Sequence, residues 1–388
     1  MQLFYITACL PMIIGLFLWL FDRKVVWAEW LIASASAFLI AGIMHAIAFM
    51  GMTDDIEMWS GTIQYVEHHP KWIEEYKKEH SRTVVVGKDS RGNNITRTKR
   101  WTTTEHDTHH EHWIAYASYG TEVETRNISQ ETYNDLKNKF GNQTIVSGKQ
   151  STDHWSGKFD GGDNNIYRTN DKTNYCQPVT KIFHFENRVK AAPTVFSFPK
   201  VPESIKLYKW PQNQWMHSNR LINENRIDQL SFDRFNSRLG PRKRINVIMI
   251  NFKDKDSSIA DWQQAKWIGG KKNDLVICYN QINNQTTWCK VFGWTESELC
   301  KRNIATILLQ NPVNDDILPI IENEIRRTYQ IKDWSKFDYI SIEPPTWSYI
   351  TFFVLLFVSQ VGLWIFFHMN QYTKTNVSGK YITNRRRY

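Results

Sequence analysis

Three long apolar segments interrupt an otherwise polar chain whose mean hydropathy is −0.49. Residues 3–21 and 347–367 contain no charged side chain, and residues 31–52 are interrupted only by His45. Each segment is long enough to cross a bilayer core of about 30 Å as a helix. The pattern predicts transmembrane helices over 3–21, 29–52 and 347–368.

A secretory signal peptide is the alternative interpretation of the first apolar segment. Such peptides begin with a basic region, whereas Met1 and Gln2 carry no side-chain charge. A second apolar segment also follows after only a few residues. We therefore expect the first segment to remain in the protein as a transmembrane helix.

Basic residues beside the apolar segments indicate their orientation. Arg23 and Lys24 lie between the first two segments, and the tail at 369–388 holds five lysines and arginines with no acidic residue. Short basic segments stay in the cytoplasm. With three spans, the segment with Arg23 and Lys24 and the tail can both be cytoplasmic if the polar region is extracytoplasmic. Since five charges of the net +9 belong to the tail, we expect contact with anionic lipid headgroups rather than nucleic acid.

The polar region changes its pattern midway. Residues 53–200 alternate between apolar and polar positions, which predicts a β-rich domain with a hairpin turn at 88–94 and one helix at 129–140. Residues 201–224 are rich in proline and aromatic side chains and are predicted to be a connector. Residues 225–340 predict an α/β layer sandwich, which makes the whole chain a membrane-anchored α+β protein.

Helices and strands alternate in this second region. A helix is expected to close at Gly240-Pro241, and a continuous apolar strand follows it, as in sheets buried on both faces. The predicted elements are a helix at 230–239, a strand at 245–252, a helix at 259–266, strands at 275–279 and 287–292, and helices at 296–310 and 317–329.

Residues 225–330 resemble the TPM domain, a membrane-associated family. The resemblance rests on INVIMI at 245–250, WIGGKKND at 267–274 before a strand, and FGWTE at 292–296. It implies an α/β/α sandwich, and in some relatives the acidic loop is linked to calcium binding and acid phosphatase activity. The three spans around a β-rich region also look like membrane proteins of tailed bacteriophages, which implies the inner membrane of a bacterium, with a periplasmic domain.

Four aspartates of the TPM-like segment are candidate calcium ligands, because Ca²⁺ binds several oxygen atoms at once. Three follow one predicted strand and the fourth precedes another, so their loops are expected to meet at one edge of the sheet. The alternative is that they are solvated loop charges, one of them in the first turn of a helix. The four are Asp254, Asp256, Asp261 and Asp274.

Four histidines and three carboxylates occupy eight consecutive residues from Glu105 to His112. Imidazole is a common zinc ligand, and His110 and His112 share one face of an extended segment. The alternative is an exposed strand that titrates near neutral pH. The candidate zinc ligands are His106, His109, His110 and His112.

Five cysteines are present, and four of them lie in the polar region. In an oxidising compartment these four, Cys176, Cys278, Cys289 and Cys300, allow three pairings. Cys278 and Cys289 flank a turn-like segment at 281–285, so a disulfide across that hairpin is predicted.

The sequence contains no nucleophile elbow, phosphate-binding loop or zinc-protease helix. We therefore expect a non-enzymatic membrane protein that binds or modulates a membrane or envelope partner. The alternative is a calcium-linked acid phosphatase that uses the aspartate loops. Small residues at 34–37 and Gly42 predict a helix face for close packing, within the chain or in a homo-oligomer.

Overall fold

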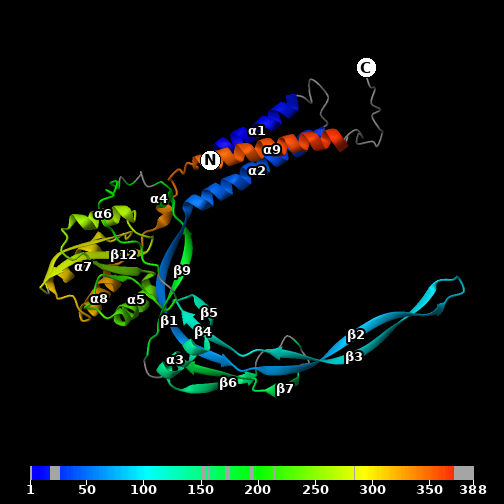
Figure 1. Cartoon of the computed structure of the whole chain (residues 1–388), viewed down its shortest axis with the longest axis horizontal. Helices are drawn as coiled ribbons and strands as arrows, with labels where there is room; N and C mark the ends of the chain where they lie inside the picture. The colour runs from blue at the N-terminus through cyan, green and yellow to red at the C-terminus, as the bar shows by residue number, and fades with distance from the viewer. Residues whose placement is uncertain are drawn as a thin grey trace.

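The computed structural model describes residues 2–17, 27–149, 154, 158–170, 175–192, 196, 198–212, 215–283 and 285–370. Within these residues Figure 1 shows an apolar helical bundle, a body that contains strands and helices, and a long two-stranded arm. The fold is mixed α/β with separate sheets, as the sequence predicts. The basic residues that predicted the orientation, at 22–24 and beyond 370, lie outside the described residues.

The bundle consists of α1 (Gln2–Phe17), α2 (Trp27–Thr53) and α9 (Thr346–Asn370), which lie together in Figure 1. In the described residues α2 and the part of α9 at 346–367 are long and apolar enough to span a membrane, whereas α1 is shorter. Ala37 and Ala41 of α2 are fully buried in a cluster with Phe4 and Phe352. Of the predicted small-residue face, Ser34 and Ala37 are buried within the chain, whereas Ala35 is exposed and a β-carbon added to Gly42 would meet nothing within 4 Å.

A continuous backbone path connects the bundle to the body. Helix α2 ends at Thr53, and β1 (Asp54–His69) begins at the next residue. The first half of β1 pairs with β9 (Pro178–Glu186), and its second half lies between β4 (His112–Ser118) and β8 (Asn165–Asn170). The outer strands are β5 (Val123–Ile128) and β6 (Gln143–Lys149).

Helix α3 (Gln130–Phe140) covers one face of this sheet and confirms the predicted helix. The Ser129 hydroxyl accepts a hydrogen bond from the backbone N–H of Thr132 at 3.1 Å, so it caps the first turn. Gly141 ends the helix with a positive φ of 88°. Leu136 and Phe140 are fully buried against the sheet.

The arm is a hairpin of β2 (Trp72–Lys88) and β3 (Asn94–His109), which extends far from the body in Figure 1. Among the described residues, the short strand β7 (Lys158–Gly162) pairs with the base of β2. The predicted turn is present, because the Asp89 carboxylate accepts hydrogen bonds from the backbone of Arg91 and Asn93 at 2.8 Å each. At about 3.3 Å per residue, β2 alone is roughly 55 Å long.

The α/β region contains the sheet β10-β11-β12-β13, in which the first three strands are parallel and β13 is antiparallel. Its strands are β10 (Leu221–Ile222), β11 (Asn246–Asn251), β12 (Asp274–Ile282) and β13 (Gln285–Gly293). One face packs on α5 (Gln229–Lys243), α7 (Glu298–Gln310) and α8 (Ile317–Thr328), and the other packs on α6 (Ser258–Lys266).

Two boundary predictions for this region were wrong. Helix α5 continues through Gly240 and Pro241 to Lys243, because its last turns pack against β1. Residues 201–224 are more than a connector, since they include β10 and the buried Arg220. Residues 205–210 also pack on the α6 side of the sheet.

The two sheets of the body meet at the middle of β1. A β-carbon added to Gly240 would lie 2.0 Å from the Ser60 carbonyl oxygen, so only glycine allows α5 to approach the strand this closely. The fully buried Arg220 donates hydrogen bonds to the hydroxyls of Ser60 (2.6 Å) and Thr180 (3.0 Å). These contacts fix the α/β region to β1 and β9.

A second contact lies nearer the bundle. The buried Asp55 carboxylate accepts a hydrogen bond from Asn187 at 2.7 Å and forms an ion pair with Lys271 of the α/β region. Burial raises the pKa of Asp55, but the bonds from Lys271 and Asn187 outweigh it and hold that pKa below its ordinary value. Strand β1 is thus attached to α2 at one end and to the α/β region along its first half.

The predicted disulfide between Cys278 and Cys289 is not formed, since all five cysteines are free. In the β12–β13 ladder Cys289 lies opposite Tyr279, which places it one residue out of register with Cys278. Successive residues of a strand point to opposite faces, so the two thiols pack in different cores. Burial raises the pKa of both thiols, that of Cys289 to about 12.

Candidate binding sites

The four predicted calcium ligands do not meet. Asp254 and Asp256 follow the C-terminal end of β11, whereas Asp274 begins β12. Because β11 and β12 are parallel, these positions lie at opposite edges of the sheet. The expectation of a common edge was therefore wrong, and the described residues contain no group of three or more His, Cys, Asp or Glu side chains able to hold a metal ion.

Each of these aspartates has a local structural contact. The Asp256 carboxylate accepts a hydrogen bond from the Ser258 backbone at 2.7 Å, and Asp261 pairs with Lys290 at 2.7 Å on the surface. The backbone N–H of Asp254 donates to Asn280, and its φ is 57°. Asp274 is the one of the four that is buried, with 1% of its surface exposed.

The predicted zinc ligands lie at the base of the arm. His109 stacks on Trp72, with ring centroids 4.1 Å apart, and shares a hydrogen bond with Glu74 at 3.0 Å. His112 stacks on His69 and bonds to the His110 carbonyl oxygen. His106 lies opposite Glu75 in the β2–β3 ladder. These side chains are distributed over separate pairs and stacks, so the described part of the chain does not assemble them into a metal centre.

The His109 contact fixes the base of the arm, because the Glu74 side chain is fully buried and His109 is its hydrogen-bond partner. The other Glu74 carboxylate oxygen has no hydrogen-bond partner among the described residues. We expect His109→Phe to keep the ring stacked on Trp72 but to leave the carboxylate without a donor. The arm base should lose about 1–3 kcal/mol of stability.

The measurement is urea unfolding of the purified full chain in detergent, with hydrogen exchange resolving the arm base. The double variant His109→Phe with Glu74→Leu removes the buried charge and should recover part of the loss. Equal stability of His109→Phe and the parent protein would show that this hydrogen bond does not hold the arm base.

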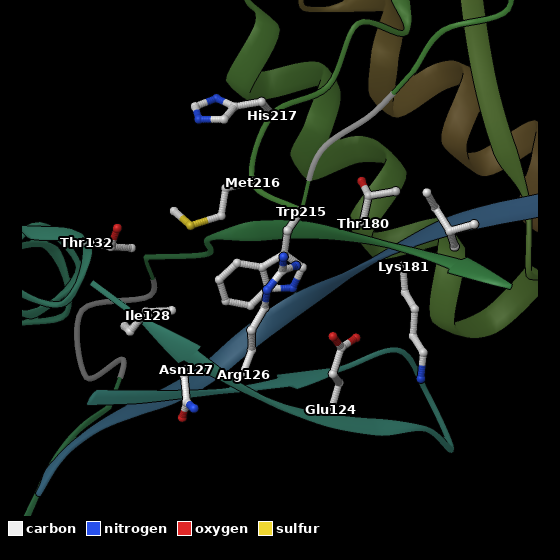
Figure 2. Close-up of a pocket in the computed structure, with 11 residues that line it drawn as sticks. Glu124, Arg126, Asn127, Ile128, Thr132, Thr180, Lys181, Trp215, Met216 and His217 are labelled. Carbon is white, nitrogen blue, oxygen red and sulfur yellow. The ribbon is translucent and has the colours of Figure 1, made fainter. Parts of the chain in front are cut away.

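A hollow of about 620 Å³ lies beside β5 and β9 on the flank of the body. Figure 2 shows Arg126 and Trp215 at its centre, with Met216 and His217 on one side and Lys181 on the other. The Arg126 guanidinium lies 5.0 Å from the centroid of the Trp215 ring, a cation–π contact. The wall is completed by Glu124 and by hydroxyl, amide and aliphatic side chains of Thr132, Thr180, Asn127, Ile128 and Ile182.

The charged groups of this hollow are engaged with neighbours. Lys181 pairs with Glu122 at 3.1 Å, and the Trp215 indole donates to the Tyr119 hydroxyl at 3.1 Å. Burial, together with the nearby charge of Glu124, raises the pKa of Tyr119. The hollow therefore suits an uncharged segment with apolar and hydrogen-bonding groups, and its described lining does not place a nucleophile beside a base.

The distal half of the arm is exposed on both of its faces. From Glu79 to Trp101 all side chains are exposed except His80 and Val84, which are half-buried. His80 stacks on Trp101 across the two strands, with centroids 5.4 Å apart. An isolated two-stranded hairpin is only marginally stable in water, so this segment owes little of its order to a core of its own.

Sequence reasoning found the arm's turn but missed the arm as a site. Its sequence does not distinguish it from a strand pair with one covered face, and only the structure shows that both faces are uncovered. The signal that was available was the surplus of lysine and arginine between residues 82 and 100. Comparison with known protein families, with curated proteins and with solved structures finds no match for this chain.

Proposed function

We propose that this chain is a membrane-anchored, non-enzymatic binding protein that uses the β2–β3 arm as its contact element. The observation that carries the proposal is the exposure of both faces of the arm from Glu79 to Trp101. Strand β1 and the short link at 70–71 connect this surface directly to α2. The arm is therefore joined to the bundle through a single strand, β1, and that link.

Anchoring in a bilayer is supported by the outer surface of the bundle. Large apolar side chains such as Ile13, Leu39, Phe357 and Trp364 are 57%, 64%, 71% and 68% exposed. A continuous apolar surface of this kind is rare on proteins that face water. We propose that α1, α2 and α9 all cross the membrane.

The orientation that we propose follows from the basic residues beside the spans. Arg23 and Lys24, together with the tail, lie on the cytoplasmic side, so the body and the arm are extracytoplasmic. The TPM-like character of residues 225–330 and a bacterial inner-membrane location belong to the same proposal. The order of strands and helices in that region, an α/β/α arrangement, supports this resemblance.

Photo-crosslinking in native membranes tests the proposed contact. A photoreactive side chain replaces Val86 near the tip of the arm in the full-length protein, and a matched variant carries it in place of Leu299 on α7. The two positions are equally exposed, at 58% and 59%. We expect several-fold more adduct with molecules other than the chain itself at position 86.

Mass analysis then separates protein adducts from lipid adducts at position 86. Equal, low yields at positions 86 and 299 would contradict the proposal, because an arm that acts as the contact element must meet its partner more often than the exposed face of α7 does.

A further inference from the structure

Charge is distributed unevenly along the arm. Near its base Lys78 pairs with Glu105 at 3.1 Å, and His154 pairs with Asp107 at 2.9 Å. Beyond this point, from residue 82 to residue 100, the sequence has one carboxylate, that of Asp89. This carboxylate accepts hydrogen bonds from the backbone of the turn. The same stretch has six cations, none of which forms an ion pair with a residue that the structure describes: Arg82, Lys88, Arg91, Arg97, Lys99 and Arg100.

The ladder brings two of these cations directly opposite each other. Arg82 pairs with Lys99, and the next residues on the same face are Val84 and Arg97. Like charges at directly opposed positions destabilise a hairpin. The arm thus retains a repulsion between exposed cations that contact with a negatively charged surface would relieve.

Apolar side chains accompany these cations. Val85 and Val86 are each 58% exposed, and Ile95 and Trp101 are 48% and 43% exposed. A combination of basic residues with exposed aliphatic and indole groups suits the interface of an anionic bilayer, where the charges meet headgroups and the apolar groups enter the acyl boundary. A soluble acidic partner would supply the charge but not, in general, the apolar layer.

The arm and the helical bundle leave the body toward the same side, the right of the view in Figure 1. The arm therefore points from the body toward the side on which a bilayer around α2 and α9 would lie. We infer that the distal half of the arm binds the surface of an anionic phospholipid bilayer, which specifies the partner in the function proposed above and rests on it.

The test uses the full chain reconstituted into vesicles of phosphatidylcholine alone or of equal parts phosphatidylcholine and phosphatidylglycerol. Hydrogen exchange is followed in the arm peptide at 79–101. We expect exchange several-fold slower in the anionic vesicles at low salt, and the protection should fall as salt screens the charges. Removing any one of the six cations from Arg82 to Arg100 should lower the ratio of membrane-bound to free arm by roughly fivefold.

The double variant Arg82→Gln with Lys99→Gln should change hydrogen exchange of the arm in opposite directions in detergent and on anionic vesicles. In detergent its arm should exchange more slowly than the parent arm, because the opposed cations no longer repel each other. On anionic vesicles its protection should be weaker than that of the parent. Lys78→Gln is the matched control, since Lys78 is already paired with Glu105 and should leave the protection unchanged.

Several outcomes overturn the inference. Equal exchange in the two lipid compositions removes the anionic surface as the partner, and protection that rises with protein density instead of phosphatidylglycerol indicates a second copy of the chain. Protection in native membranes but in neither vesicle indicates a protein partner, which leaves the proposed contact role intact. Absence of adducts at position 86 in native membranes is the separate result that contradicts that role itself.

Discussion

Replacing Arg220 with alanine is expected to destabilise the body by about 3–5 kcal/mol, the largest effect that we expect of any single substitution. Its guanidinium is fully buried and donates to Ser60 and Thr180, one on each strand of the β1–β9 ladder. Burial lowers the pKa of Arg220 to about 10, so it remains charged at neutral pH, near the buried carboxylates of Asp233 and Asp274. Alanine would leave the two hydroxyls without their donor and Asp233 without the nearby guanidinium charge.

Urea unfolding of the full chain in detergent, followed by near-ultraviolet circular dichroism, measures this effect. Arg220→Lys keeps the charge but not the fork that reaches both hydroxyls, so we expect a smaller loss of about 1–3 kcal/mol. The exposed Arg226 provides the control, because Arg226→Ala should change stability by less than about 0.5 kcal/mol. If Arg220→Ala and Arg226→Ala proved equally stable, the buried guanidinium would not join the two sheets.

Asp274→Ala is expected to cost at least about 3 kcal/mol, because it leaves buried donors without acceptors. The carboxylate accepts hydrogen bonds from the Asn246 amide (2.7 Å), the Trp210 indole (2.8 Å) and the Lys271 backbone (2.8 Å). Asp274→Asn should cost only about 1 kcal/mol. The Asn246 side-chain oxygen has no partner among the described residues, so a flip of that amide would let it accept from the new side chain.

The pH dependence of stability separates these variants further. Burial raises the pKa of Asp274 above its ordinary value of 3.8, despite the bonds from Asn246, Lys271 and Trp210 that lower it. The folded form therefore holds this proton more tightly than the unfolded form. The stability that this bound proton contributes is fully present below pH 3.8, and it is lost as the pH rises through the folded-state pKa of Asp274. Asp274→Asn should lack this loss.

Comparing the two unfolding curves from pH 3 upward is the check. Asp261→Ala serves as the control, since this carboxylate is exposed and paired only with Lys290 at the surface. If Asp274→Asn were as unstable as Asp274→Ala, an amide at position 274 could not replace the hydrogen bonds of the carboxylate, and the predicted flip of Asn246 would be wrong.

Local signals predicted most elements of this fold. Ser129 and Gly141 define α3 because a cap and a left-handed glycine act within one turn, and Asp89 defines the turn of the arm for the same reason. The end of α5 was wrong because Gly240 is placed by Ser60, a contact between residues 180 positions apart in the sequence. Packing across such a separation is not encoded in local periodicity.

The candidate sites were harder to predict, since each depends on register or strand direction. Cys278 and Cys289 flank a hairpin, yet a register offset of one residue puts them on opposite faces. Asp254 and Asp274 flank neighbouring strands, yet parallel pairing sends them to opposite edges. Arg220 gave no signal, because a single arginine in a polar segment does not reveal that two distant hydroxyls will bury it.

The most direct test of the central claim, that the arm is the contact element of a membrane-anchored protein, is hydrogen exchange of the full chain in native membranes and in detergent. The distal arm has no core of its own, so its amides should exchange several-fold more slowly in native membranes, where a partner covers them. Helix α7 should exchange equally in both. Identical exchange of residues 79–101 in membranes and in detergent would contradict the account.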